Sequence, residues 1–382
     1  MTWSKGEMLK EREPTVMMKK ALLLLLIFVF CLSSAYAEDN VWVEETWERI
    51  DREVDCDGLP LLIHARVLDV PDGTEACEYH LDKLSDDDLV EKGQQINWTA
   101  LGLDMSHGKW RLPDKIGHDY TFVSEPDVYP NCTLFSYLQF VMINRSQLYQ
   151  NTYTVREYIN SDDAEIKGIS NEQIKAYAET VATECGFQLG NILRVYKCDD
   201  AKTVQANMIT IAKDYGKRTD IDLETATEYT FTDVIYPVYF NGLRLYSGER
   251  TYTQDEREIL NMNMRMAVTA GHGILAVEGP IIDSDHMKVV TEMKPVISAE
   301  DALRCMEEKY SGFYHPQLKS VTVQELALEY VLVPSDPSAE KGYTVYPAWV
   351  AQTYEKWRNE SGELWYWVGY EAYDARTGEE IF

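Results

Sequence analysis

The stretch Ile297–Gly312, ISAEDALRCMEEKYSG, contains a helix start, an apolar stripe and a helix stop. Ser298 is placed to cap free backbone N–H groups, and Glu300 and Asp301 fall in the first turn, where negative charge suits the helix dipole. Gly312 marks the end of the pattern. The apolar residues at helical spacing are Ala302, Leu303, Met306 and Tyr310. This pattern predicts a capped helix with one face against a core.

Two earlier stretches begin in the same way. Ser85 opens the run SDDD and Ser170 opens the run SNEQ, and each is followed by apolar residues at helical spacing. We expect the second of these helices to end at Gly186. Its predicted apolar stripe is Ile174, Tyr177, Ala178 and Val181.

Strand patterns fill the sequence between and after these helices. Apolar residues alternate with polar ones from 61 to 70, the period of a half-buried strand. The aromatic run from 229 to 240 meets Asn241-Gly242, the favoured two-residue hairpin turn, and returns at Leu243. A second hairpin is expected to join 264–269 to 274–277. Three strands are predicted after the last helix, at 321–333, 343–354 and 364–373.

These elements predict an α+β fold of successive modules, each a capped helix packed on an antiparallel sheet. The length of 382 residues is enough for two or three domains with separate cores. We expect an upstream extension and signal peptide at 1–37 and an N-terminal α+β domain at 38–160. A middle α+β domain at 161–290 and a C-terminal domain at 291–382 follow.

Residues 17–37, MMKKALLLLLIFVFCLSSAYA, have the order of a signal peptide. Lys19 and Lys20 precede an apolar run, and Ala35 and Ala37 form the small-x-small pattern of a signal-peptidase site. The run is shorter than the roughly 20 apolar residues of a membrane-spanning helix. We therefore expect a secreted or extracellular protein associated with the cell envelope. The alternative is an uncleaved segment that gives the chain its one contact with a membrane.

The charge balance restricts the partners. The chain has 64 acidic and 36 basic residues, for a formal net charge of −28. Because nucleic acids and anionic membrane surfaces are themselves polyanions, neither is expected to bind.

The cysteines are compatible with either disulfide bonds or free thiols. Six follow the signal segment: Cys56, Cys77, Cys132, Cys185, Cys198 and Cys305. An exported chain with an even count permits three disulfides, of which Cys185–Cys198 and Cys56–Cys77 are closest in sequence. Free buried thiols acting as small apolar side chains fit equally well.

No motif names a reaction. The sequence has no HExxH, GxSxG, Walker or GxGxxG pattern, so we predict no catalytic, cofactor-binding or metal-binding residues and no cofactor. The two carboxylates of a glycoside hydrolase have no fixed spacing in the sequence, because they need to be close only in the folded structure. A secreted hydrolase that uses acidic residues, on glycans for example, therefore stays as the alternative to a protein without catalysis.

Tryptophans near the C-terminus are candidates for a binding surface. Trp365 and Trp367 are two apart and face the same side of a strand, with Trp349 on the preceding predicted strand. Exposed, these side chains would form a platform for peptide or glycan. Buried, they would belong to the core of a small sheet.

The same C-terminal region resembles a known family. Tyr346-Pro347-Ala348-Trp349 and the run YDARTGEEI from 373 to 381 follow the capped helix. Together they are similar to the PepSY-like domains of Gram-positive exported proteins, including the YycH/YycI type that modulates a cell-wall sensor kinase. The likeness covers about residues 165–382. It implies a capped helix on a short antiparallel sheet and a regulatory role.

The chain departs from that family at its N-terminus, because its signal looks cleavable while the kinase modulators keep an uncleaved helix. We predict an exported, non-enzymatic binding or regulatory protein of the bacterial cell envelope. Its expected partner is an envelope protein, such as a sensor or protease, or a cell-wall component. A purely structural wall protein is a third hypothesis.

Overall fold

Strands make up most of the regular structure. The computed structural model describes residues 41–112, 119–124, 131–143, 157–159, 169–198, 200–214, 220–248, 252–254, 257–282, 286–313, 315–336 and 339–382. The signal segment, with Ala35 and Ala37, lies outside these residues. Strands account for 46% and helices for 20%, and the described part has five short helices beside large curled sheets. The predicted α+β fold of helix-capped modules is therefore wrong, because strands from distant segments of the chain pair with one another in the same sheets.

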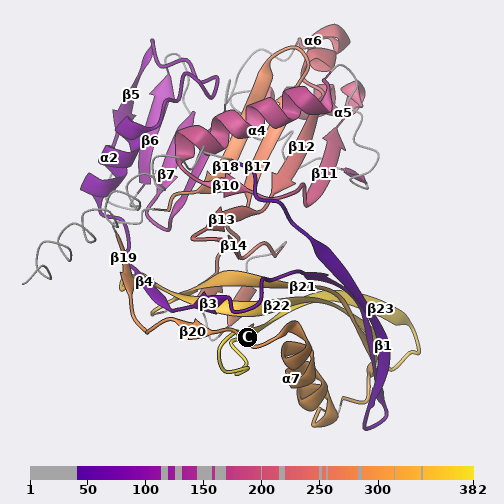
Figure 1. Ribbon diagram of the computed structural model, residues 1–382. Coiled ribbons are helices and arrows are strands. Elements are labelled where there is room, and N and C mark those ends of the chain that lie inside the picture. Colours follow the sequence, from indigo (N-terminus) through magenta and orange to yellow (C-terminus); the bar gives the residue numbers. More distant parts are fainter. Residues whose placement is uncertain are drawn as a thin grey trace, which may run out of the picture. The chain divides into compact units, whose positions relative to one another are not determined.

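A ten-stranded sheet is built on two long antiparallel strands, β21 (Leu318–Pro334) and β22 (Tyr343–Arg358) (Figure 1). The other strands are β1 (Trp47–Cys56), β2 (Leu59–Leu68), β4 (Tyr79–Leu81), β10 (Gln188–Leu189), β13 (Val238–Phe240), β14 (Leu243–Leu245), β19 (Met287–Val289) and β23 (Leu364–Asp374). The segments 38–160, 161–290 and 291–382 all contribute strands to it. This mixing explains why the sheet has no counterpart in any single stretch of sequence.

The free edge of β21 changes its neighbour along its length. The first part pairs with β2 in parallel, ending at Leu326, and the next part pairs with β14 in parallel at Glu329 and Tyr330. One strand thus bridges an N-terminal neighbour and a middle one. The site described below lies at the point where β21 passes from one neighbouring strand to the other.

A β-bulge lies just before this change. The register between β21 and β22 shifts between Val323 and Glu325, which leaves Gln324 as an extra residue. A bulge reverses the faces of the residues that follow it. The β21 side chains in the core beside the C-terminal helix are Leu318, Val321, Val323, Leu326 and Leu328. Glu325 and Glu329 consequently point to the opposite face.

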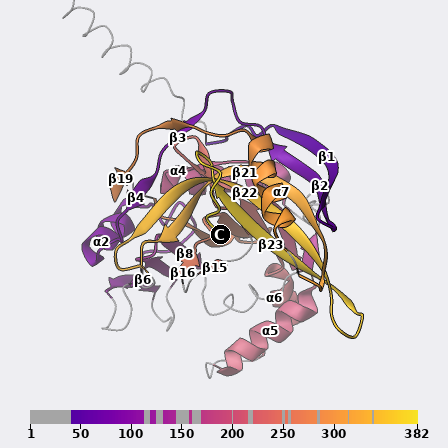
Figure 2. The same ribbon diagram turned by 90° about the horizontal axis from the view of Figure 1, so that it is seen from below.

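The helix α7 (Ala299–Ser311) covers one face of these strands, as Figure 2 shows. Its predicted start is confirmed, because the Ser298 hydroxyl accepts a hydrogen bond from the N–H of Asp301 at 3.1 Å. The predicted apolar face is confirmed as well: Ala302, Leu303, Met306 and Tyr310 are buried. Trp349 packs in the same core and donates from Nε1 to the carbonyl oxygen of Ile297 at 2.9 Å.

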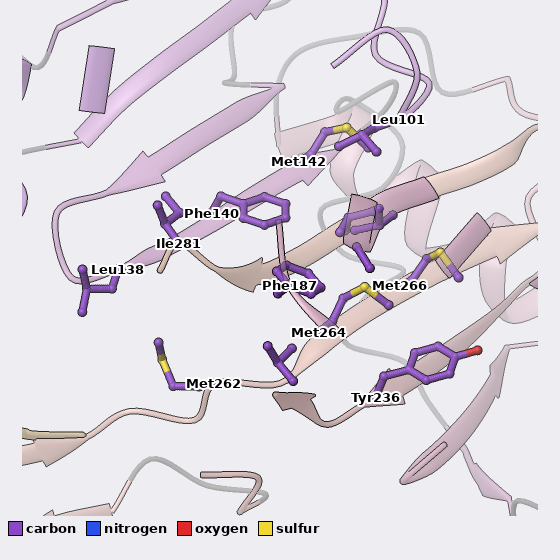
Figure 3. Packing of buried hydrophobic residues seen from close by; sticks show 14 of the residues in the cluster. Leu101, Leu138, Phe140, Met142, Phe187, Tyr236, Met262, Met264, Met266 and Ile281 are labelled. Atoms are coloured by element: carbon purple, nitrogen blue, oxygen red, sulfur yellow. The ribbon is translucent and has the colours of Figure 1, made fainter. Parts of the chain in front are cut away.

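A second sheet has nine strands, all antiparallel. Its order is β5 (Gly108–Arg111), β6 (Asp119–Ser124), β7 (Cys132–Phe135), β8 (Gln139–Ile143), β18 (Gly273–Pro280), β17 (Met264–Thr269), β12 (Phe231–Tyr236), β11 (Arg194–Cys198) and β9 (Glu157–Ile159). The helix α4 (Asn171–Cys185) packs on one face of this sheet through a shared apolar core. Figure 3 shows part of that core, including Phe140, Met264 and Tyr236.

Short elements complete the described part. The helices are α2 (Asp86–Gln95), α5 (Ala201–Asp214) and α6 (Leu223–Glu228), and two small sheets pair β3 (Glu75–Ala76) with β20 (Lys294–Pro295) and β15 (Tyr252–Gln254) with β16 (Arg257–Ile259). The capping boxes at Ser85 and Ser170 and the stop at Gly186 are confirmed. The hairpin turn is confirmed too, since Asn241 and Gly242 have φ of 48° and 80°.

All six described cysteines are free, and four of them are buried. Neither the Cys185–Cys198 nor the Cys56–Cys77 bond is present. The thiols therefore act as apolar side chains, and burial raises the pKa of Cys132 and Cys185 well above the ordinary thiol range.

The packing of α7 on the sheet predicts a stability difference between its two faces. Met306→Ala should lower the free energy of unfolding by about 2–5 kcal/mol, because it leaves a cavity in a closed core. Glu308→Ala, on the exposed face of the same helix, should change it by less than about 0.5 kcal/mol. Urea unfolding followed by circular dichroism measures both. Equal effects would contradict the burial of this face.

Candidate functional site

A polar pocket of about 540 Å³ lies where β21 exchanges β2 for β14. Its walls come from β2, β14, β21, β22 and β23 of the larger sheet and from β11 of the nine-stranded sheet. Its volume falls in the range of small-molecule sites. The lining side chains that carry charge or hydroxyl groups include Arg66, Arg194, Arg244, Glu325, Glu329 and Tyr370.

Arg244 lines the pocket and is only 1% exposed. Its Nη2 donates to the Ser247 hydroxyl at 2.6 Å. Its Nε lies 3.1 Å from Oε1 of Glu329, an ion pair outside hydrogen-bond geometry. Among the described residues, Nε and Nη1 have no hydrogen-bond partner. A buried charged group with unused donors is costly, so this guanidinium keeps a strong tendency to bind an acceptor.

Glu329 is the buried partner of Arg244. The Ser247 hydroxyl donates to Oε1 at 2.6 Å, and the Ser247 N–H donates to Oε2 at 3.2 Å. Burial raises the pKa of Glu329 to about 7, although Arg244 and the hydrogen bonds from Ser247 act in the other direction. The pKa of Arg244 is itself raised, since the attraction of Glu329 and Glu325 outweighs its own burial. The arginine stays charged, while the glutamate gains or loses its proton near neutral pH.

Glu325 joins Arg244 to a second arginine. Its Oε1 lies 3.5 Å from Nη2 of Arg244, and its Oε2 lies 3.1 Å from Nη2 of Arg66. Both guanidinium groups lie over the ring of Trp47, at 4.6 Å for Arg66 and 5.6 Å for Arg244. Cation–π contact of this kind stabilises the positive charge of both arginines.

The opposite wall is supplied by β11. Nη2 of Arg194 donates to the Tyr370 hydroxyl at 3.4 Å, and Nε2 of Gln352 donates to the same oxygen at 3.3 Å. Three arginines and two glutamates therefore line one pocket. Their charges leave the pocket positive whether Glu329 is ionised or not. This local excess contrasts with the net charge of −28 of the chain, and it favours an anionic ligand.

The three tryptophans proposed from the sequence lie in different environments. Trp349 is 2% exposed and belongs to the core beside α7, so it is not part of a surface. Trp365 and Trp367 are 42% and 47% exposed near the end of the β22–β23 hairpin. Trp365 stacks on Trp357, with ring centroids 5.4 Å apart and planes at 13°.

The pocket itself was missed by sequence reasoning. Most of its residues sit on six strands and share no motif; Arg66 and Glu325, for example, are 259 positions apart. A weak signal was present, because Glu325 and Glu329 interrupt the apolar run predicted as a strand at 321–333. A charged side chain that interrupts a buried strand needs a partner, which here is Arg244.

Neither a metal-ligand cluster nor a membrane-length helix occurs among the described residues. No group of three or more His, Cys, Asp or Glu side chains is arranged to hold a metal ion. No helix in this part of the chain has the length and apolarity to cross a membrane.

Comparison with known proteins gives a fold and no function. No family model matches the chain, and no curated protein matches it. The crystal structure of an uncharacterized protein from Eubacterium rectale is similar, with a TM-score of 0.56 over 84% of this chain and 90% of that chain. The two sequences are 15% identical. At that identity the likeness concerns the fold alone.

The Arg244–Glu329 pair predicts a specific pattern of stability. Arg244→Met should lower the free energy of unfolding by about 3–5 kcal/mol at pH 8, because it leaves a buried carboxylate without its counter-charge. The double variant Arg244→Met/Glu329→Leu should recover most of that loss. Urea unfolding of the three proteins tests this. A double variant no more stable than Arg244→Met would show that the cost lies elsewhere.

The raised pKa of Glu329 predicts a pH dependence with a defined sign. Between its ordinary pKa of 4.5 and about 7, the folded chain holds a proton that the unfolded chain has released. Stability therefore falls as pH rises through this window. The free energy of unfolding of the natural chain, taken relative to Glu329→Gln, should drop by about 2–3 kcal/mol from pH 5 to pH 8. A constant difference across this range would contradict a neutral-range pKa.

Proposed function

We propose that the chain is an exported, non-enzymatic binding protein of the bacterial cell envelope, and that the polar pocket binds an anionic group of its ligand. One observation carries the binding site: Arg244 lines the pocket, and two of its buried guanidinium nitrogens have no hydrogen-bond partner among the described residues. A charged guanidinium nitrogen forms a strong hydrogen bond with a carboxylate oxygen. Arg66 and Arg194 add positive charge on two other walls.

The envelope assignment is supported by the sequence. The signal-like segment at 17–37 and the resemblance of the C-terminal region to PepSY-like exported proteins both favour it. Peptide stems of the bacterial wall carry free carboxylates, which can accept hydrogen bonds from the arginines of the pocket. We therefore favour a wall fragment as the ligand over an envelope protein.

A secreted hydrolase is the second candidate, and one feature favours it. Glu325 and Glu329 line the same pocket, and the pKa of Glu329 is raised to about 7, in the range of a general acid. Against this, both oxygens of Glu329 accept hydrogen bonds from Ser247, and Arg244 lies beside them. The carboxyl group of Glu329 therefore already has protein partners, which opposes its use as a general acid.

A binding experiment with wall fragments separates the two candidates. Muropeptides released from a Gram-positive wall by a muramidase are mixed with the purified chain, and their binding is measured by equilibrium dialysis with mass spectrometry. We expect acidic fragments to be retained with unchanged mass. Arg194→Met should weaken their binding by roughly tenfold to a hundredfold, because it removes a charged donor from the wall of the pocket.

The matched control is Arg304→Met, an exposed arginine on α7 that pairs with Asp301. It should bind as the natural chain does. Retention of no fragment would overturn the proposed wall ligand. Fragments of reduced mass that disappear with Glu329→Gln would instead establish the hydrolase.

A further inference from the structure

Anion binding in this pocket changes the surroundings of a buried acid. Two glutamates, Glu325 and Glu329, share the single guanidinium of Arg244. Glu325 has a second arginine, because Arg66 lies 3.1 Å from its other oxygen. Glu329 is 2% exposed and has only Arg244 as a charged partner among the ion pairs of the described residues. Any ligand that competes for Arg244 therefore weakens the counter-charge of Glu329 in particular.

We propose that the pocket binds a carboxylate-bearing ligand together with one proton, which is taken up by Glu329 when the ligand carboxylate occupies the guanidinium of Arg244. This rests on the proposed function. The ligand brings a negative charge into the pocket, and the proton from solvent bonds to an oxygen of Glu329. The net charge of the binding residues and ligand is then preserved, and no buried carboxylate is left unpaired.

The groups around Glu329 support this direction. The titratable and charged side chains that face it are Arg244 on β14, Glu325 on β21 and Tyr239 on β13. The Tyr239 hydroxyl donates to Glu45 at 2.7 Å, and the negative charge of Glu45 also acts on Arg244. Arg66 and Arg194 also line the pocket. A second anion therefore finds positive charge in the pocket, while Glu329 has no replacement for Arg244.

The resting state of Glu329 makes the coupling effective at physiological pH. Burial raises its pKa to about 7 before any ligand is present. Loss of the counter-charge raises the pKa further, so a group that is partly ionised near neutral pH becomes protonated on binding. By linkage, the affinity for the anion must fall as pH rises through this range.

Calorimetry measures the proton directly. The full chain is titrated with succinate at pH 7.5 in HEPES, imidazole and Tris, three buffers with different heats of ionisation. The dependence of the binding heat on the buffer gives the protons taken up, and we expect between about a half and one per ligand. The dissociation constant should rise by roughly threefold to tenfold from pH 7 to pH 8. Sulfate, titrated in parallel, shows whether the site accepts any anion or selects the carboxylate.

Two variants make the test specific. Glu329→Gln should bind succinate without proton uptake and with one dissociation constant from pH 7 to pH 8. Glu308→Gln, which replaces an exposed glutamate on α7, should keep both the uptake and the pH dependence.

The outcomes separate this inference from the proposed function. If neither succinate nor wall fragments bind, the pocket is not an anion site and both ideas fail. If succinate binds with a heat that is the same in all three buffers, the site stands and the proton coupling is wrong. Proton uptake that persists in Glu329→Gln also overturns the assignment to this residue. Tighter binding of sulfate than of succinate would overturn the choice of a carboxylate.

Discussion

The pairing of β21 with β22 is the constraint on which the rest of the larger sheet depends. These two strands are paired from Leu318 to Pro334, and every other strand of that sheet is attached to their edges directly or through one or two neighbours. Because β21 is long, its free edge accommodates two different partners in succession. The bulge at Gln324 sits just before the second partner joins. One extra residue therefore decides which side chains of β21 reach the pocket and which reach the core.

The pocket brings together charged side chains on strands that are otherwise largely apolar. Strands with apolar neighbours on both faces rarely tolerate glutamate, and each buried carboxylate needs a compensating donor. Here one arginine serves two carboxylates, and Ser247 supplies further hydrogen bonds to the more buried one. The carboxylate oxygens of Glu329 both accept hydrogen bonds, whereas two nitrogens of Arg244 have no acceptor among the described residues. That asymmetry separates it from a structural ion pair, such as Arg265 with Asp233, in which three hydrogen bonds join the two groups.

Local chemistry was predictable from the sequence, and long-range pairing was not. Ser85, Ser170 and Ser298 begin helices where their patterns predicted, and Asn241-Gly242 turns a hairpin, because caps and turns depend on a few neighbouring residues. The α+β modules were wrong because the capped helices do not each have a sheet of their own. The candidate site was missed for the same reason, since Arg244 meets Glu329 only after β14 docks beside β21. The sequence left open whether Trp349 belongs to a binding surface or to a core, and the structure buries it in the core beside α7.

The parallel contact between β2 and β21 has a consequence for biosynthesis. Leu61 pairs with Val321, so the ribosome must finish nearly the entire polypeptide before this contact can form. Closing so large a loop is slow. Until β21 emerges, the β2 edge that pairs with it in the finished sheet stays exposed. The larger sheet is therefore completed late in synthesis, after every strand of the nine-stranded sheet, the last of which ends at Pro280, has been made.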